Sequence, residues 1–139
     1  MKKTILSLCV ASFTATSHGA QENPDFLARS WNAAPRLETQ STGYAYSGYD
    51  PYQRAYLFEK RGGEGRELAC EISASPKSPV SNLCLVIKNW GASPASNLLN
   101  GRHVTGGDCA AGFVRTLEGD DIVVWLPVKS TQKVKVSVK

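Results

Sequence analysis

Apolar and polar residues alternate in two segments of the chain. In residues 68–74 (LACEISA) every second residue is apolar and its neighbours are polar or small. In residues 134–138 (VKVSV) valine alternates with lysine and serine. A period of two is typical of a strand with one face buried and the other in water. Both segments are therefore predicted to be half-buried strands.

Continuous apolar runs and turn residues predict further strands. Residues 83–87 (LCLVI) are apolar throughout, which predicts a strand buried on both faces. Residues 113–117 and 122–128 form the arms of a predicted hairpin that turns at 118–120. Pro127 indicates that its strand ends early or lies at a sheet edge there, because proline has no N–H to donate. Asn100-Gly101, between short apolar segments, is typical of a type I′ hairpin turn.

These segments together predict the fold class. Further strand candidates at 44–46 and 55–58 bring the total to seven or eight, with turn residues every eight to twelve positions. No segment after residue 20 has a convincing helical pattern. We therefore expect an all-β fold, a small antiparallel β-sandwich, with an open barrel as the second choice. Lysines on the polar face of residues 133–139 are expected to protect an edge strand from pairing with another chain.

The first forty-three residues differ from the rest. Residues 1–20 contain two lysines, a short apolar run and a small-residue patch, the order of a signal peptide, which predicts a secreted or periplasmic protein. The apolar run is too short to cross a bilayer, so no membrane span is expected. Residues 21–43 are polar and contain two prolines, and are interpreted as an extended lead-in. The predicted domain spans 44–139.

Charge and cysteine content narrow the functional classes. The net charge is +4, falls to +2 without Lys2 and Lys3, and the basic residues are scattered, so the pattern does not favour a nucleic-acid partner. Three cysteines follow residue 20. In an oxidising compartment two are expected to pair, and of the three possible pairings we predict Cys84–Cys109, which flank strand-like segments. Their spacing does not suit zinc, so neither a metal nor a cofactor is expected.

No complete catalytic constellation is visible, so we do not assign an enzymatic activity. Asp120 and Asp121 are adjacent, so they would point to opposite sides of a strand and could not serve one glycosidase cleft together. With Asp108 they are better explained as turn residues than as calcium ligands. His103 is the only histidine after residue 20, and it follows the Asn100-Gly101 turn. A nucleophilic site would have to be built around it.

The aromatic residues are the candidates for ligand binding. Flat rings beside amide and guanidinium groups can stack on the faces of sugars. The alternative is that these tyrosines pack over the open end of the sandwich. Trp90 and Trp125 lie in apolar strands and are predicted to be core residues. The candidate ligand-binding residues are Tyr44, Tyr46, Tyr49, Tyr52, Arg54 and Tyr56.

About two thirds of the chain resembles a β-rich accessory module found at the C-terminal end of large secreted bacterial enzymes that degrade or modify polysaccharides. In those enzymes the catalytic residues precede the module, so none is transferred here. The resemblance implies a supporting or glycan-contacting role, as an independent module or as a remnant of an enzyme. The segments that carry it are YDPYQRAY (49–56), SPVSN (78–82), VIKNWG (86–91) and TLEGDDIVVWL (116–126).

Three functions remain in order of preference. The first is a secreted non-catalytic β-sandwich that binds a carbohydrate or supports a polysaccharide-acting enzyme, so that its partner is a polysaccharide or that enzyme. The second is a periplasmic or secreted protein-interaction domain of the inhibitor or immunity type. The third is a small enzyme that uses His103. The sequence assigns neither the ligand nor the oligomeric state.

Overall fold

The computed structural model describes residues 23–62 and 67–139. The predicted signal peptide, residues 1–20, lies outside this part of the chain. Within it, no helix is long and apolar enough to cross a membrane. The described residues form one α-helix, ten strands and a 3-10 turn: α1 (Pro24–Asn32), β1 (Arg36–Gln40), β2 (Tyr44–Asp50), β3 (Ala55–Lys60), β4 (Leu68–Ser73), β5 (Val80–Lys88), β6 (Asn97–Leu99), β7 (Arg102–Val104), η1 (Gly106–Asp108), β8 (Ala110–Arg115), β9 (Asp120–Ser130) and β10 (Val134–Val138).

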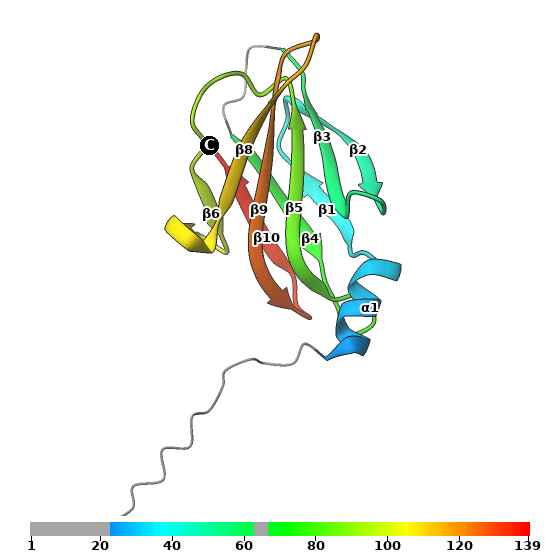
Figure 1. Ribbon diagram of the computed structural model, residues 1–139. Coiled ribbons are helices and arrows are strands. Elements are labelled where there is room, and N and C mark those ends of the chain that lie inside the picture. The colour runs from blue at the N-terminus through cyan, green and yellow to red at the C-terminus, as the bar shows by residue number, and fades with distance from the viewer. Residues whose placement is uncertain (1–22, 63–66) are drawn as a thin grey trace, which may run out of the picture.

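Two five-stranded sheets pack face to face, as the layers in Figure 1 show. Sheet A has the order β1-β4-β10-β6-β7, and sheet B has the order β2-β3-β5-β9-β8. Every pairing is antiparallel except that of β3 with β5, which is parallel. The sheets do not close into a barrel. The predicted all-β sandwich is confirmed.

The core lies between the inner faces of the sheets. Leu68, Cys70 and Ile72 of β4 are buried, as are the three valines of β10, so the alternation predicted for both segments is confirmed. On β5 the inward residues are buried, but Cys84 and Val86 on its outer face are only half-buried, so the prediction of burial on both faces is wrong. That outer face has no second sheet to cover it.

The Asn100-Gly101 turn joins β6 to β7 as predicted. Asn100 and Gly101 both have positive φ, 50° and 79°, which a type I′ turn requires. The turn also contacts β10: the Asn100 N–H donates to the Lys135 carbonyl oxygen at 2.8 Å, and the Lys135 N–H donates to Asn100 Oδ1 at 2.9 Å. A short hairpin is thereby anchored to the middle of sheet A.

The expected extended lead-in is instead a helix followed by a strand. Asn23 caps α1, because its Oδ1 accepts a hydrogen bond from the Asp25 N–H at 3.0 Å, and Pro24 occupies the first turn. β1 then forms an edge of sheet A beside β4. The expectation of no helix after residue 20 is wrong, because Pro24 lies in the first turn of α1, where a proline does not interrupt a helix.

The lysine-bearing strand is central, not an edge strand as predicted. β10 lies between β4 and β6, and the lysines within and beside it pair with glutamates of β1 and β4 instead of guarding an edge. Lys133 contacts Glu38 and Glu71, and Lys135 lies 3.2 Å from Glu71. The alternation of apolar and polar residues indicates which face of the strand is exposed to solvent, but not whether the strand lies at the edge or in the middle of the sheet.

Pro127 does not end its strand, because β9 continues to Ser130. Pairing with β8 stops at Trp125, so beyond that point β9 has a hydrogen-bonded neighbour, β5, on one side only. The predicted local edge is therefore present, while the predicted early end is wrong.

The predicted Cys84–Cys109 disulfide is absent, and Cys70, Cys84 and Cys109 are all free thiols. Cys84 lies on the outer face of sheet B, between the buried Leu83 and Leu85. Cys109 packs against the core and accepts a hydrogen bond from Asn97 Nδ2 at 3.0 Å. The two cysteines thus lie on opposite sides of one sheet.

Candidate functional site

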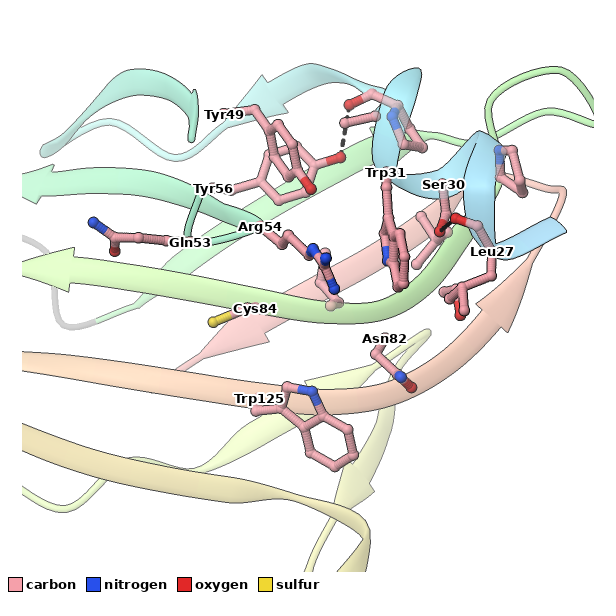
Figure 2. A pocket seen from close by; sticks show the side chains of 16 residues that line it. Leu27, Ser30, Trp31, Tyr49, Gln53, Arg54, Tyr56, Asn82, Cys84 and Trp125 are labelled. Atoms are coloured by element: carbon pink, nitrogen blue, oxygen red, sulfur yellow. Dashed lines mark hydrogen bonds between the residues drawn. The ribbon is translucent and has the colours of Figure 1, made fainter. Parts of the chain in front are cut away.

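A groove of about 320 Å³ opens where α1 meets the start of β5. It continues onto the outer face of sheet B, where Cys84 and Trp125 lie. Figure 2 shows the two indoles on opposite sides of Asn82. We call this hollow the Trp31–Trp125 groove. Its polar lining includes Gln53, Arg54 and Asn82.

Helix α1 and the segment after it form one wall. The buried Tyr56 hydroxyl donates to the Pro35 carbonyl oxygen at 2.7 Å, drawn as a dashed line in Figure 2. The Ser78 hydroxyl donates to the Ala33 carbonyl oxygen. Core and turn residues thereby fix the connection between α1 and β1. The Trp31 side chain, on the last turn of α1, is held over the groove with 38% of its surface exposed.

Arg54 reaches the same wall from the turn between β2 and β3. Asp50 Oδ1 accepts hydrogen bonds from the Tyr52 and Gln53 N–H groups, at 2.8 and 3.3 Å, and so shapes the turn. Arg54 ends it with φ of 53°, a left-handed conformation that is uncommon for a non-glycine residue. Its guanidinium carbon lies 3.7 Å from the centre of the Trp31 ring. This cation–π contact positions both side chains, as Figure 2 shows.

A β-bulge where β5 pairs with β9 forms the floor: Asn82 of β5 lies opposite two residues of β9, Pro127 and Val128. The register between β5 and β9 shifts between Ser81 and Leu83, and Asn82, at the shift, has φ of 57°. Bulges re-aim side chains and are frequent beside functional sites. Next to it, Ser81 Oγ is buried and has no hydrogen-bond partner among the described residues. An unpaired hydroxyl of this kind calls for an explanation, and it lies in the lining of this groove.

Trp125 forms the other side of the groove, and its predicted place in the core is wrong. On β9 the buried residues are Ile122, Val124 and Leu126, so Trp125 points outward and remains 38% exposed. The residue opposite it on β8 is Ala110, whose side chain is too small to cover an indole. Trp90, in contrast, is buried as predicted, and its Nε1–H donates to the Ser93 carbonyl oxygen at 3.0 Å.

The six candidate ligand-binding residues are divided among three environments. Tyr49, Arg54 and Tyr56 line the groove. Tyr44 and Tyr46 belong to the packing between the sheets, where Tyr46 lies 5.3 Å from Phe58 between ring centres. Tyr52 is 96% exposed on the β2–β3 turn, outside the groove lining. Part of the cluster thus contacts the groove while the rest does not.

Burial governs the chemistry of the titratable groups near the groove. It raises the pKa of the Tyr49 and Tyr56 hydroxyls and of the Cys84 thiol above their ordinary values. These groups therefore stay protonated at neutral pH, and Cys84 is a poor nucleophile. Among the described residues, the groove lining contains neither a carboxylate nor an imidazole, and Arg54 is its one basic side chain. This arrangement suits binding better than proton transfer.

The residues considered for catalysis do not meet at the groove. His103 lies exposed on β7, the far edge of sheet A, with Nδ1 3.3 Å from Ser96 Oγ. Asp120 pairs with Arg115 at 2.9 Å, and Asp121 Oδ1 accepts the Asn89 N–H at 3.0 Å. No cluster of three or more histidine, cysteine or acidic residues suited to a metal ion occurs in the described residues. Asp120 and Asp121 thus have the structural roles expected of them.

Two groove residues are not among the six predicted ligand-binding residues, for different reasons. Trp31 could have been found, because Asn23-Pro24-Asp25 is a helix start signal and Trp31 follows Leu27 at helical spacing. Asn82 had no signal of its own, because a bulge arises from the pairing of β5 with β9 and not from a local motif.

Searches of protein-family models, of curated proteins and of solved structures found no match to this chain.

Proposed function

We propose that this chain is an exported, non-catalytic β-sandwich that binds carbohydrate in the Trp31–Trp125 groove. The observation that carries the proposal is the pair of half-exposed indoles on one hollow, one from α1 and one from β9. An indole offers a flat apolar plane with a polar edge, which matches the apolar face and hydroxyl rim of a pyranose ring.

Polar groups with fixed positions support the proposal. Arg54 is held by Trp31, and Asn82 is held by its pairing opposite the bulge of β9, so their donors and acceptors need little ordering when a ligand binds. Both residues have strained left-handed backbones, a feature that tends to gather at binding sites. The groove lies near the lower end of the range of ligand pockets, about 300–1,000 Å³, which suits a short glycan segment.

Retention of the purified chain on a panel of immobilised and insoluble polysaccharides tests the proposal. Trp125→Ala is the sharpest variant, because its side chain lies outside the core, so the fold should be retained. We expect it to weaken binding about two- to tenfold, the loss of one stacking contact. Trp31→Ala should weaken binding at least as much, since it also releases Arg54.

Tyr52→Ala is the matched control. It removes an aromatic ring that is more exposed than either indole but lies outside the groove lining, so retention should not change. If no glycan retains the wild type, or if Trp125→Ala and wild type are retained equally on every glycan, the proposal is wrong. Loss of retention in Tyr52→Ala alone would move the binding surface to the β2–β3 turn.

A further inference from the structure

The edge strand β8 differs from the other three edges of the sandwich. β1 and β2 each contain an irregularity of register, and β1 also carries Glu38. β7 has only three residues, two of them Arg102 and His103. Bulges, charges and short length all protect an edge against pairing. In β8 (AAGFVR) the register with β9 is regular, and no charge occurs before Arg115.

Exposed apolar side chains gather at this same edge. All six residues of β8 are exposed, with Phe113 and Val114 about half exposed, and Leu117 in the adjoining turn is fully exposed. Phe113 pairs with Ile122 and so belongs to the inner face of sheet B, yet sheet A does not cover it. A long, uncharged edge strand with exposed apolar residues is a template for strand addition.

The hydrogen-bond pattern of the hairpin shows which groups of β8 are free to pair. The Thr116 N–H donates to the Gly119 carbonyl oxygen at 2.8 Å. In an antiparallel ladder the residues that bond to the partner strand alternate, so Ala110, Gly112 and Val114 direct their backbone groups to β9. The intervening residues, Ala111, Phe113 and Arg115, direct theirs outward.

The opposite side of β9 agrees with this assignment. Asp120, which pairs with Arg115, accepts a hydrogen bond from the Gly91 N–H through its carbonyl oxygen at 3.1 Å, so its backbone faces away from β8. Among the described residues, Ala111, Phe113 and Arg115 form no backbone hydrogen bond outside the strand ladders.

We propose that two copies of this chain pair through β8, antiparallel about a two-fold axis at Phe113, so that sheet B continues across the interface. In this register Phe113 lies opposite its own copy, and Ala111 lies opposite Arg115 of the other copy. All outward N–H and C=O groups of these three residues then find partners. The contact is isologous and closes at two copies.

Side-chain size and charge favour a second copy over an unrelated strand. Gly112 falls opposite Val114 of the other copy, and the space beside Gly112 is open, since a Cβ there would meet no atom within 4 Å. Arg115, the one charged residue of β8, faces an alanine and not a like charge. The strand is thus complementary to itself in size and free of repulsion.

Opposite charges at position 111 test both the partner and the register. Ala111→Lys places a lysine against Arg115 of the other copy, whereas Ala111→Glu places a carboxylate there. Each contact occurs twice, so the dimer dissociation constant should rise about two- to thirtyfold for lysine and fall by a similar factor for glutamate. Sedimentation equilibrium of the purified chain over a wide concentration range measures both changes.

Ser47→Lys and Ser47→Glu, at an exposed position on the opposite edge strand of sheet B, are the matched controls and should leave association unchanged. Unfolding temperatures of all four variants show that the fold is kept. The proposal would be overturned if the wild-type chain stays monomeric at every concentration measured. The same holds if the monomeric chain co-purifies with another protein. Open-ended assembly beyond two copies, or equal dissociation constants for Ala111→Lys and Ala111→Glu, would also overturn it.

Discussion

The outer faces of the two sheets differ in the kind of side chain that they expose to solvent. On sheet A, charged side chains on and beside β4 and β10 pair with one another, as in Lys135 with Glu71 and Lys139 with Glu67. On sheet B, the outward residues in the middle of β5 and β9 are the half-buried Cys84, Val86 and Val123 and the exposed Trp125. α1 covers only one end of this second face, as Figure 1 shows.

This difference indicates where a ligand can gain binding energy. Exposed ion pairs contribute little to stability, about 0–1 kcal/mol each, but they leave few polar groups without a partner. The paired charges on the outer face of sheet A therefore have little to offer a ligand. The outer face of sheet B exposes apolar surface, and burying such surface contributes about 25 cal/mol per Å². A ligand in the groove would cover part of this surface, which is favourable.

Removing the Tyr56 hydroxyl, which holds the segment after α1 in place, should have the largest effect on the free energy of unfolding. Tyr56→Phe leaves the buried Pro35 carbonyl oxygen without its partner, which costs about 1–3 kcal/mol. The loss should concentrate on the groove side of the molecule. We expect faster hydrogen exchange in α1 with little change in β10, together with a lower unfolding temperature and weaker glycan retention.

Ser137→Ala is the corresponding change on sheet A. It removes an exposed hydroxyl that donates to Glu67, and should alter the free energy of unfolding by less than about 1 kcal/mol. If Tyr56→Phe is as stable as wild type, or if its exchange rates rise equally in both sheets, then the hydroxyl does not hold the groove wall.

Replacing either of two asparagines with left-handed backbones by glycine should have a smaller effect on stability. The effect should differ between Asn82 on sheet B and Asn100 on sheet A. Asn82→Gly relieves strain in the folded chain but adds entropy to the unfolded chain, so stability should change by no more than about 0.5 kcal/mol while glycan retention falls. Asn100→Gly also removes the partner of the Lys135 N–H and should cost about 1 kcal/mol, with retention unchanged.

Urea unfolding and polysaccharide retention of both variants check this prediction. Asn100 serves as the control for Asn82, because the two have similar φ angles of 50° and 57° and differ in surroundings. Equal stability of the two variants would contradict the role assigned to the Asn100 side chain. Retention that survives Asn82→Gly would remove Asn82 from the binding site.

Much of the fold could be predicted because its signals are local. Alternation marked β4 and β10, and Asn100-Gly101 marked the β6–β7 turn by the φ angles that it requires. The order of strands in each sheet could not be predicted. β10 was expected at an edge and lies in the middle, because the residues that surround a strand come from distant parts of the chain.

The candidate site was predictable only in part, for the same reason. Arg54, Tyr49 and Tyr56 were found from their residue types. Trp125 was expected in the core because its neighbours are apolar. Whether an indole on β9 is covered depends on the strand beside it, and β8 places Ala110 there. Cys84 and Cys109 similarly fall on opposite sides of sheet B, which spacing alone does not reveal.

The smallest effect we predict is a difference in pH dependence between the stability of the fold and the binding of glycan in the groove. On sheet A, hydrogen bonding with Lys133 lowers the pKa of Glu38, and hydrogen bonding with Ser137 lowers the pKa of Glu67, both from an ordinary value of 4.5. A lowered pKa in the folded chain means that the stability these carboxylates contribute is present above the ordinary value. It is lost as the pH falls through the lowered one.

The described residues that line the groove include no carboxylate or imidazole, so retention of a neutral glycan should stay constant from about pH 8 to pH 5 and fall only when the fold itself is lost. The unfolding temperature should therefore fall between pH 6 and pH 2, whereas glycan retention should not change as long as the chain stays folded. The double variant Glu38→Gln, Glu67→Gln should weaken the decline in unfolding temperature below pH 4.5 without altering retention at pH 5. An unchanged decline would place the acid sensitivity elsewhere. Retention that follows a titration between pH 8 and pH 5 would mean that an ionisable group outside the groove lining contacts the glycan.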